Sequence, residues 1–286
     1  MVAQLLVDAS NLTISSIDIT ECEEATFTMS MRSRITNTGP LAAHIDAMTV
    51  SMFAELPSSY TDPSQTSTLG AFAAVRLPAL SIDPKGTDCI VTGQHITIKN
   101  AAQFDTFNRN LINQSELPVH ISGSSTIRVM GLSCAVRYNK TVLLKGMEGL
   151  QITVLQTRRQ SRNGNVSGIE VDVEVLNRSC VAMDMGRVHV GIHHESVVIA
   201  QLQASLRLLP GLNRVTWQGR MNVGGLLKSP KVGSAFLRRD LQGEKVGAVV
   251  VGERGEQTRW IDAVVKEMAS PITMDSTLRD IYNSAK

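Results

Sequence analysis

Alternation of apolar and polar residues is the feature that most limits how this chain can fold. In residues 28–35 the odd positions are mostly apolar and the even ones polar, and similar alternation recurs at 48–52, 169–175 and 188–192. A period of two places one face of a strand against a core and the other against solvent. Turn sequences such as Asn-Thr-Gly-Pro at 37–40 and Leu-Pro-Gly at 209–211 separate the runs. Many short strands with such turns predict a mainly-β fold of antiparallel sandwiches.

These strand blocks form an internal repeat. A shift of 140 residues superposes Met29, Met31, Ile35, Asn37, Ala42, Met48, Val50 and Met52 on Ile169, Val171, Val175, Asn177, Ala182, Val188, Val190 and Ile192. A shift of 126 superposes Leu80, Ile82, Pro84, Val91 and Gly93 on Leu206, Leu208, Pro210, Trp217 and Gly219. The shifts differ by 14 residues, which correspond to a Ser/Thr/Pro-rich stretch at 57–70 that is typical of an exposed loop. The repeat predicts two tandem antiparallel β-sandwich domains, residues 1–149 and 150–275, followed by a polar tail or linker at 276–286.

Short helices are predicted after the strand block of each repeat. Asn100 is a candidate N-cap for a helix over residues 101–111, in which Phe104, Phe107 and Leu111 share one side. The second repeat predicts a helix over 230–241, with Pro near its start, and another over 260–268. Further strands are expected at 119–130, 142–144 and 246–251. Each domain is therefore expected to carry one or two short helices.

The composition argues against several classes of protein. Lys and Arg number 28 against 26 Asp and Glu, a net charge of +2, so there is no basic stripe to bind the phosphates of a nucleic acid. No window approaches the roughly 18 consecutive apolar residues of a transmembrane helix. Residues 1–8 also lack the basic start and long apolar core of a signal peptide.

The sequence shows no catalytic or metal-binding constellation. The four cysteines do not have the spacing of metal ligands; they are Cys22, Cys89, Cys134 and Cys180. The sequence is compatible with a disulfide and also with free thiols. There is no Gly-x-Ser-x-Gly elbow for a nucleophilic serine. We therefore expect a protein that is not an enzyme and that needs no cofactor.

One histidine cluster is a candidate metal site. It contains His189, His193, His194 and Glu195. On a strand His189 and His193 would share a face, but a third ligand at matched spacing is missing. Residues 193–196 are more typical of an exposed turn, so no metal site is predicted.

Five Asn-x-Ser/Thr sequons are candidate glycosylation sites, at Asn11, Asn139, Asn113, Asn165 and Asn177. Chance would give roughly two in a chain of this composition. The excess favours a luminal or extracellular address, and accidental sequons in a cytosolic chain are the alternative. Asn11, in a Thr/Ser-rich segment, and Asn139, expected in a polar turn, are predicted as the main carriers. Asn177 ends a strand, where its side chain would instead cap the turn.

Several segments together resemble a known family. They are residues 3–14 (Ala-Gln-Leu-Leu-Val-Asp-Ala-Ser-Asn-Leu-Thr-Ile), 27–52, 104–111 (Phe-Asp-Thr-Phe-Asn-Arg-Asn-Leu) and 139–147 (Asn-Lys-Thr-Val-Leu-Leu-Lys-Gly-Met). This succession resembles a fungal family of membrane-anchored proteins whose domain has no assigned biochemical activity. Both repeats are also similar to the water-stress domain of late embryogenesis abundant proteins of the β-sandwich type, most closely at 171–177 (Val-Asp-Val-Glu-Val-Leu-Asn). Thr38 and Arg178 stand where that domain usually has Pro, so this resemblance implies a related fold rather than a related function.

The family resemblance carries expectations about address and function. It implies a transmembrane helix just before the first strand, which would make this chain an ectodomain, or one segment of a longer protein, on the luminal (vacuolar) or extracellular side of a membrane. The expected function is a non-enzymatic scaffold or interaction module with an unknown protein partner. The alternative is binding of a lipid or another apolar ligand in an opening between the sheets, since twelve Met in an aromatic-poor chain make an adaptable core.

Overall fold

The computed structural model divides the chain into two compact units, which are described separately. The structure describes residues 2–54, 70–162, 165–194, 197–222 and 246–274. Unit 1 contains Met1–Gly146 with Ser179–Met183, and unit 2 contains Met147–Arg178 with Asp184–Lys286. The loop predicted at 57–70 lies outside the described residues except for its last residue. The helix predicted at 230–241 and the tail at 276–286 lie outside them entirely. Strands dominate and the helices are few and short, which confirms the predicted mainly-β class.

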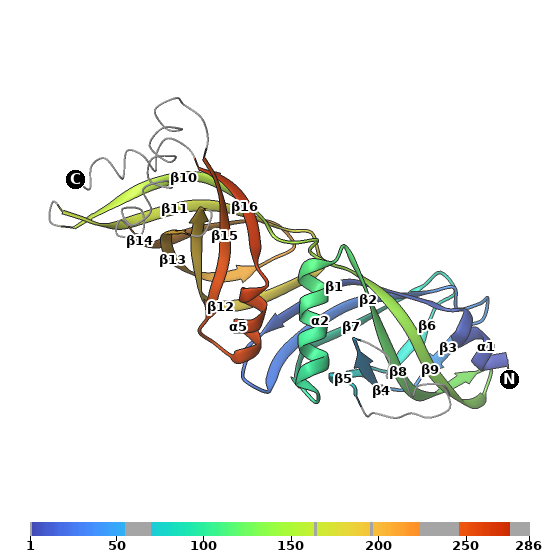
Figure 1. Cartoon of the computed structure of the whole chain (residues 1–286). Coiled ribbons are helices and arrows are strands. Elements are labelled where there is room, and N and C mark those ends of the chain that lie inside the picture. Colours follow the sequence, from blue (N-terminus) through green and yellow to red (C-terminus); the bar gives the residue numbers. More distant parts are fainter. Residues whose placement is uncertain (1, 55–69, 163–164, 195–196, 223–245, 275–286) are drawn as a thin grey trace. The chain divides into compact units, whose positions relative to one another are not determined.

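Unit 1 is a sandwich of two β-layers (Figure 1). Layer A consists of β1 (Asn11–Thr20), β2 (Thr26–Thr36) and β7 (Thr87–Thr97), paired antiparallel. Layer B consists of β3 (Ala43–Ile45), β4 (Met48–Phe53), β5 (Ala73–Leu77), β6 (Leu80–Ile82), β8 (Glu116–Val129) and β9 (Leu132–Lys145). One pairing departs from the antiparallel prediction, because Ile17 in β1 faces Val181, the first residue of β12 (Val181–His194), in a parallel ladder.

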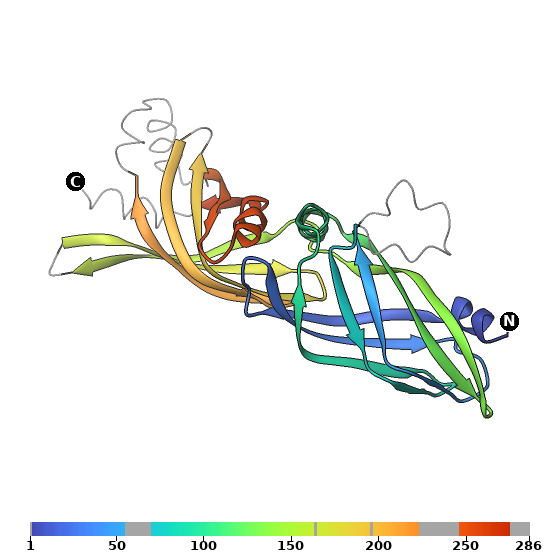
Figure 2. The same cartoon turned by 90° about the horizontal axis from the view of Figure 1, so that it is seen from below.

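Two helices lie at opposite ends of unit 1, α1 (Val2–Ala9) and α2 (Ala101–Asn113) (Figures 1 and 2). The predicted N-cap of α2 is confirmed, since the side-chain oxygen of Asn100 accepts a hydrogen bond from the main-chain nitrogen of Gln103 at 3.1 Å. The rings of Phe104 and Phe107 are buried, as predicted. Helix α1 was not predicted from the sequence.

Strands β8 and β9 are longer than the sequence predicted. They meet at a turn in which Met130 and Gly131 have φ of 50° and 80°. Positive φ at both central residues is the geometry of a type I′ hairpin turn, which lets two strands pair along their whole length. Asn139 therefore lies within β9, so the turn predicted at this residue was wrong.

Unit 2 consists of one hydrogen-bonded sheet and one described helix. In sheet order the strands are β10 (Gln151–Arg162), β11 (Asn165–Asn177), β14 (Gly211–Met221), β13 (Val197–Leu208), β12, β15 (Val246–Gly255) and β16 (Ala269–Met274). The sheet folds over, because the main-chain nitrogen of Ile152 in β10 donates to the Ser270 hydroxyl in β16 at 3.0 Å. Helix α5 (Arg259–Lys266), predicted at 260–268, begins after its N-cap Thr258.

The two units repeat the same strand pairings at the shifts found in the sequence. Met31 of β2 faces Val91 of β7, and their counterparts Val171 and Trp217 face each other between β11 and β14. A β-bulge in β1 recurs in β10 at the equivalent position. The internal repeat is therefore a repeat of topology and of register.

Two separate strands of unit 1, β5 and β6, correspond to one continuous strand of unit 2, β13. A break at Pro78 separates β5 from β6, whereas β13 continues through Ala204 at the equivalent position. Proline has no N–H to donate to a ladder, which disfavours a continuous strand at this position.

Comparison of the two repeats also draws attention to a buried hydroxyl group in unit 2 that lacks a hydrogen bond. Thr157 is 1% exposed, and its hydroxyl has no hydrogen-bond partner in the described part of the chain. The equivalent residue in unit 1 is Ile17, which faces Met31 just as Thr157 faces Val171. The core at this position therefore accommodates an aliphatic side chain.

Replacing Thr157 by valine is expected to raise the free energy of unfolding by about 1 kcal/mol, because an unpaired buried hydroxyl is removed without a change of shape. Urea denaturation measures the effect. Thr153→Val, at an exposed position of the same strand, should change stability by less than about 0.5 kcal/mol. A Thr157→Val protein less stable than the parent chain would contradict the prediction.

A candidate apolar site in unit 1

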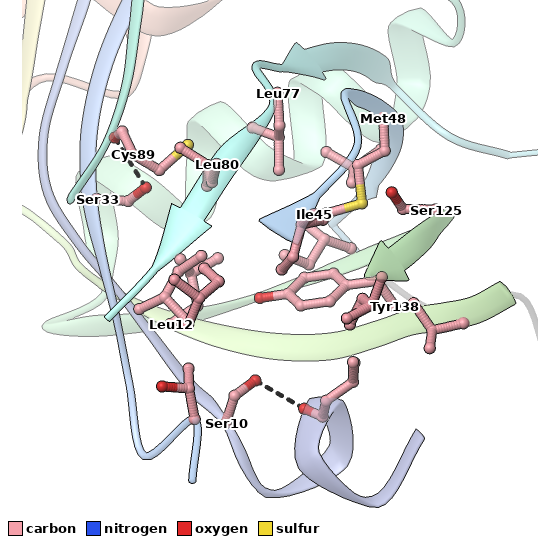
Figure 3. Close-up of a pocket in the computed structure, with 18 of the residues that line it drawn as sticks. Ser10, Leu12, Ser33, Ile45, Met48, Leu77, Leu80, Cys89, Ser125 and Tyr138 are labelled. Carbon is pink, nitrogen blue, oxygen red and sulfur yellow. Dashed lines mark hydrogen bonds between the residues drawn. The ribbon is translucent and has the colours of Figure 1, made fainter. Parts of the chain in front are cut away.

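The side chains between the two layers of unit 1 leave a hollow (Figure 3). Its volume is about 70 Å³. None of the described residues that line it is charged, and five carry a hydroxyl group. The apolar wall consists of Leu6, Val7, Leu12, Ile14, Met31, Ile35, Ala43, Ile45, Met48, Val50, Met52, Val75, Leu77, Pro78, Leu80, Ile82, Cys89, Ile121, Ile127, Val129 and Val136.

Strand alternation explains much of this wall. Met31 and Ile35 of β2 and Met48, Val50 and Met52 of β4 occupy the alternate positions that the sequence predicted to face a core. Side chains at i and i+2 of a strand lie on the same face. The two layers therefore present apolar faces to each other, and the hollow is the part of this interface that they leave unfilled.

Four of the five hydroxyl groups in the wall donate to main-chain carbonyls. The pairs are Ser10 to Val7 (2.7 Å), Ser33 to Cys89 (3.2 Å), Ser125 to Asp46 (2.8 Å) and Thr38 to Asp83 (3.4 Å). Because these donors are already engaged, they contribute little polarity to the hollow.

Tyr138 of β9 carries the fifth hydroxyl. The residue is 6% exposed, and its Oη has no hydrogen-bond partner among the residues that the structure describes. Burial is the main cause that raises the pKa of Tyr138, so the phenol stays protonated. A neutral phenol can donate one hydrogen bond and also accept one. Figure 3 shows this ring among the side chains that line the hollow.

Helix α1 forms part of the same wall through Leu6 and Val7. The Lys140 ammonium of β9 donates to the main-chain oxygens of Asp8 at 2.6 Å and Ser10 at 2.7 Å, where α1 ends. Burial lowers the pKa of Lys140. The end of α1 is thus tied to the strand that carries Tyr138.

The predicted glycosylation sites differ in exposure. Asn11 and Asn113 are exposed, Asn139 is half-buried, Asn177 is 1% exposed, and the Asn165 side chain lies outside the description. The Oδ1 atom of Asn139 accepts a hydrogen bond from the Ser122 hydroxyl at 2.6 Å. The folded chain therefore leaves room for a glycan at Asn11 and Asn113 and none at Asn177.

The histidine cluster lies at the end of β12 in unit 2. His189 pairs with Glu256, and this hydrogen bond is the main reason why the pKa of Glu256 is lowered. His193 Nε2 is 3.8 Å from Glu253. His194 is a buried residue of β12, so the exposed turn predicted there was wrong. Glu195 lies outside the residues that the structure describes. Within the described ranges, no group of three or more His, Cys, Asp or Glu side chains is placed to hold a metal ion.

All four cysteines lie in the described part of the chain, and none of them forms a disulfide. Burial raises the pKa values of Cys89 and Cys180, which keeps both thiols protonated and poorly nucleophilic. Of the helices that the structure describes, none is both long enough and apolar enough to span a membrane.

Residues 70–192 match the model of a family described as "Protein of unknown function (DUF3712)". No curated protein matches the sequence. Among solved structures, the chain is similar to a red sea bream transglutaminase at 10% identity and a TM-score of 0.25, over 92% of this chain and 31% of that one. It is also similar to the YadV chaperone (10% identity, TM-score 0.21, 93% of this chain and 100% of that one). A third similarity is to the CupB2 chaperone of Pseudomonas aeruginosa, at 10% identity and a TM-score of 0.17, over 93% of this chain and 99% of that one. Similarities this weak do not bear on function.

Proposed function

We propose that unit 1 is a non-catalytic binding module that takes up the apolar chain of a lipid between its two layers. The supporting observation is the uncharged, mostly aliphatic hollow that both layers line. Burial of apolar ligand surface against such a wall contributes about 25 cal/mol per Å². Met31, Met48 and Met52 supply flexible side chains that can adapt to a guest.

The size of the hollow restricts the shape of the ligand. At about 70 Å³ it is far smaller than the roughly 300–1,000 Å³ of a site for a drug-sized molecule. A compact ligand would force the layers well apart. An unbranched acyl chain is narrow enough to enter with smaller side-chain movements, so the ligand class that fits best is a slender one.

The competing proposal is a non-enzymatic scaffold or interaction module that recognises a protein partner through its surface. The small volume of the hollow favours it, because about 70 Å³ can also be left by imperfect packing of a core that never takes up a ligand. The two proposals differ in whether the purified chain carries or accepts an apolar guest.

Native mass spectrometry of the full chain, purified without detergent, distinguishes them. Lipid binding predicts a co-purifying lipid, or uptake of one 1-decanol per chain from a cyclodextrin carrier. Val136→Phe, which places a larger side chain in the wall, should weaken uptake at least tenfold, whereas Val249→Phe, at an exposed position of unit 2, should not. Circular dichroism would verify that both variants are folded. A clean apo mass with no decanol uptake by the parent chain would refute the binding module and favour the scaffold.

We also propose a luminal or extracellular address. It is supported by the excess of sequons, two of which are exposed, Asn11 and Asn113. Endoglycosidase treatment of the protein from its native host should shift its mobility, and the double variant Asn11→Gln/Asn113→Gln should reduce the shift. An unchanged mobility, together with four freely alkylatable thiols in the denatured protein, would overturn this address.

A further inference from the structure

We infer that the Tyr138 hydroxyl receives a single uncharged polar group on the apolar ligand, so that the hollow prefers a chain bearing a hydroxyl or ester carbonyl to a pure hydrocarbon. This rests on the proposed function, since it names the chemistry of the guest in the same hollow. It adds that the ligand is held in one orientation, with its polar atom at β9.

The first argument is the state of the hydroxyl groups in the wall. Those of Ser10, Ser33, Thr38 and Ser125 donate to main-chain carbonyls, and that of Tyr138 alone has no partner among the described residues. Most buried polar groups in native structures are hydrogen-bonded, and one without a partner is costly, so the Tyr138 hydroxyl requires an explanation. A hydroxyl or carbonyl on the guest would satisfy this one.

The second argument concerns charge. No described residue of the wall is charged, and the nearby cation on β9, Lys140, is engaged by the main-chain oxygens of Asp8 and Ser10. An ionised carboxylate in the hollow would be buried without a counter-charge, which is strongly unfavourable. The polar group of the guest is therefore uncharged.

Isothermal titration with 1-decanol, decane and decanoate at pH 8, each supplied from cyclodextrin, tests this inference. In Tyr138→Phe, decanol should bind about two- to tenfold more weakly, the effect of one hydrogen bond, while decane is unaffected. Ser125→Ala removes a hydroxyl of the same wall that is already engaged, and should leave the ratio of decanol to decane affinity unchanged. Decanoate should bind the parent chain at least tenfold more weakly than decanol.

The outcomes separate the two levels of the proposal. If neither decanol nor decane binds the parent chain, the proposed function fails. If both bind and Tyr138→Phe does not change their affinity ratio, the role of Tyr138 is refuted while the binding module stands. Decanoate binding as tightly as decanol would overturn the requirement for an uncharged group. The melting temperature of Tyr138→Phe without ligand should equal or exceed that of the parent chain, which excludes misfolding as the cause of a weaker affinity.

Discussion

Replacing Phe104 by alanine is expected to lower the free energy of unfolding by about 3–5 kcal/mol, as large aromatic truncations in a core do. Phe104 is 1% exposed, and its ring centroid lies 5.4 Å from that of Phe27 and 5.8 Å from that of Phe72. Phe27 belongs to β2 of layer A, and Phe72 lies just before β5 of layer B. The Phe104 ring therefore connects both layers to α2, and its loss leaves a cavity where they meet.

Urea denaturation followed by circular dichroism measures this loss for the whole chain. Tryptophan fluorescence reports unit 2, because Trp217 and Trp260 both lie there. The two signals together distinguish a loss confined to unit 1 from one that reaches unit 2. Asp105→Ala, at the next and more exposed position of α2, should cost less than about 0.5 kcal/mol. A loss below about 1 kcal/mol for Phe104→Ala would contradict the anchoring role of this ring.

Replacing Gly219 by alanine is expected to destabilise the chain by about 2–3 kcal/mol through overpacking. A Cβ atom at this position would overlap the main-chain oxygen of Gln201 and would lie 2.8 Å from the Cα atom of Leu202. Both are backbone atoms of β13, so no side-chain rotation can relieve the contact. The pairing of β13 with β14 would have to open, which urea denaturation followed by tryptophan fluorescence would detect.

The matched control is Gly93, which the repeat places at the position equivalent to Gly219. Gly93 has φ of +56°, and a Cβ atom there would meet nothing within 4 Å. Gly93→Ala should therefore cost only the backbone strain of the left-handed region, about 1 kcal/mol. Gly93→Asn should cost less, because asparagine tolerates this region. Equal losses for Gly93→Ala and Gly219→Ala would show that close backbone approach is not what requires glycine at 219.

Part of the candidate site could be predicted from the sequence. The alternation in β2 and β4 predicted that Met31, Met48 and Met52 face a core, and these residues line the hollow. Tyr138 was missed because β9 was expected only over 142–144. Tyr138 lies four positions before Val142, on the same face of the strand, but Lys140 lies between them on that face and interrupts the apolar pattern. Its ammonium leaves the strand to bind the end of α1, a contact between segments more than a hundred residues apart.

Local sequence by itself determined where the alternating strands lie, which face those strands bury, and which strands are equivalent in the two units. It could do so because successive side chains of a strand point to opposite faces, so apolar residues recur at every second position. The N-cap at Asn100 was also predictable, because it depends on residues only three positions apart. The tertiary structure alone decided whether a buried hydroxyl has a partner. The carbonyl that Ser125 meets is 79 residues away, and the one that Ser33 meets is 56 residues away. The hollow and the unpaired Tyr138 hydroxyl depend on how closely two layers of distant strands approach, and no local pattern encodes that distance.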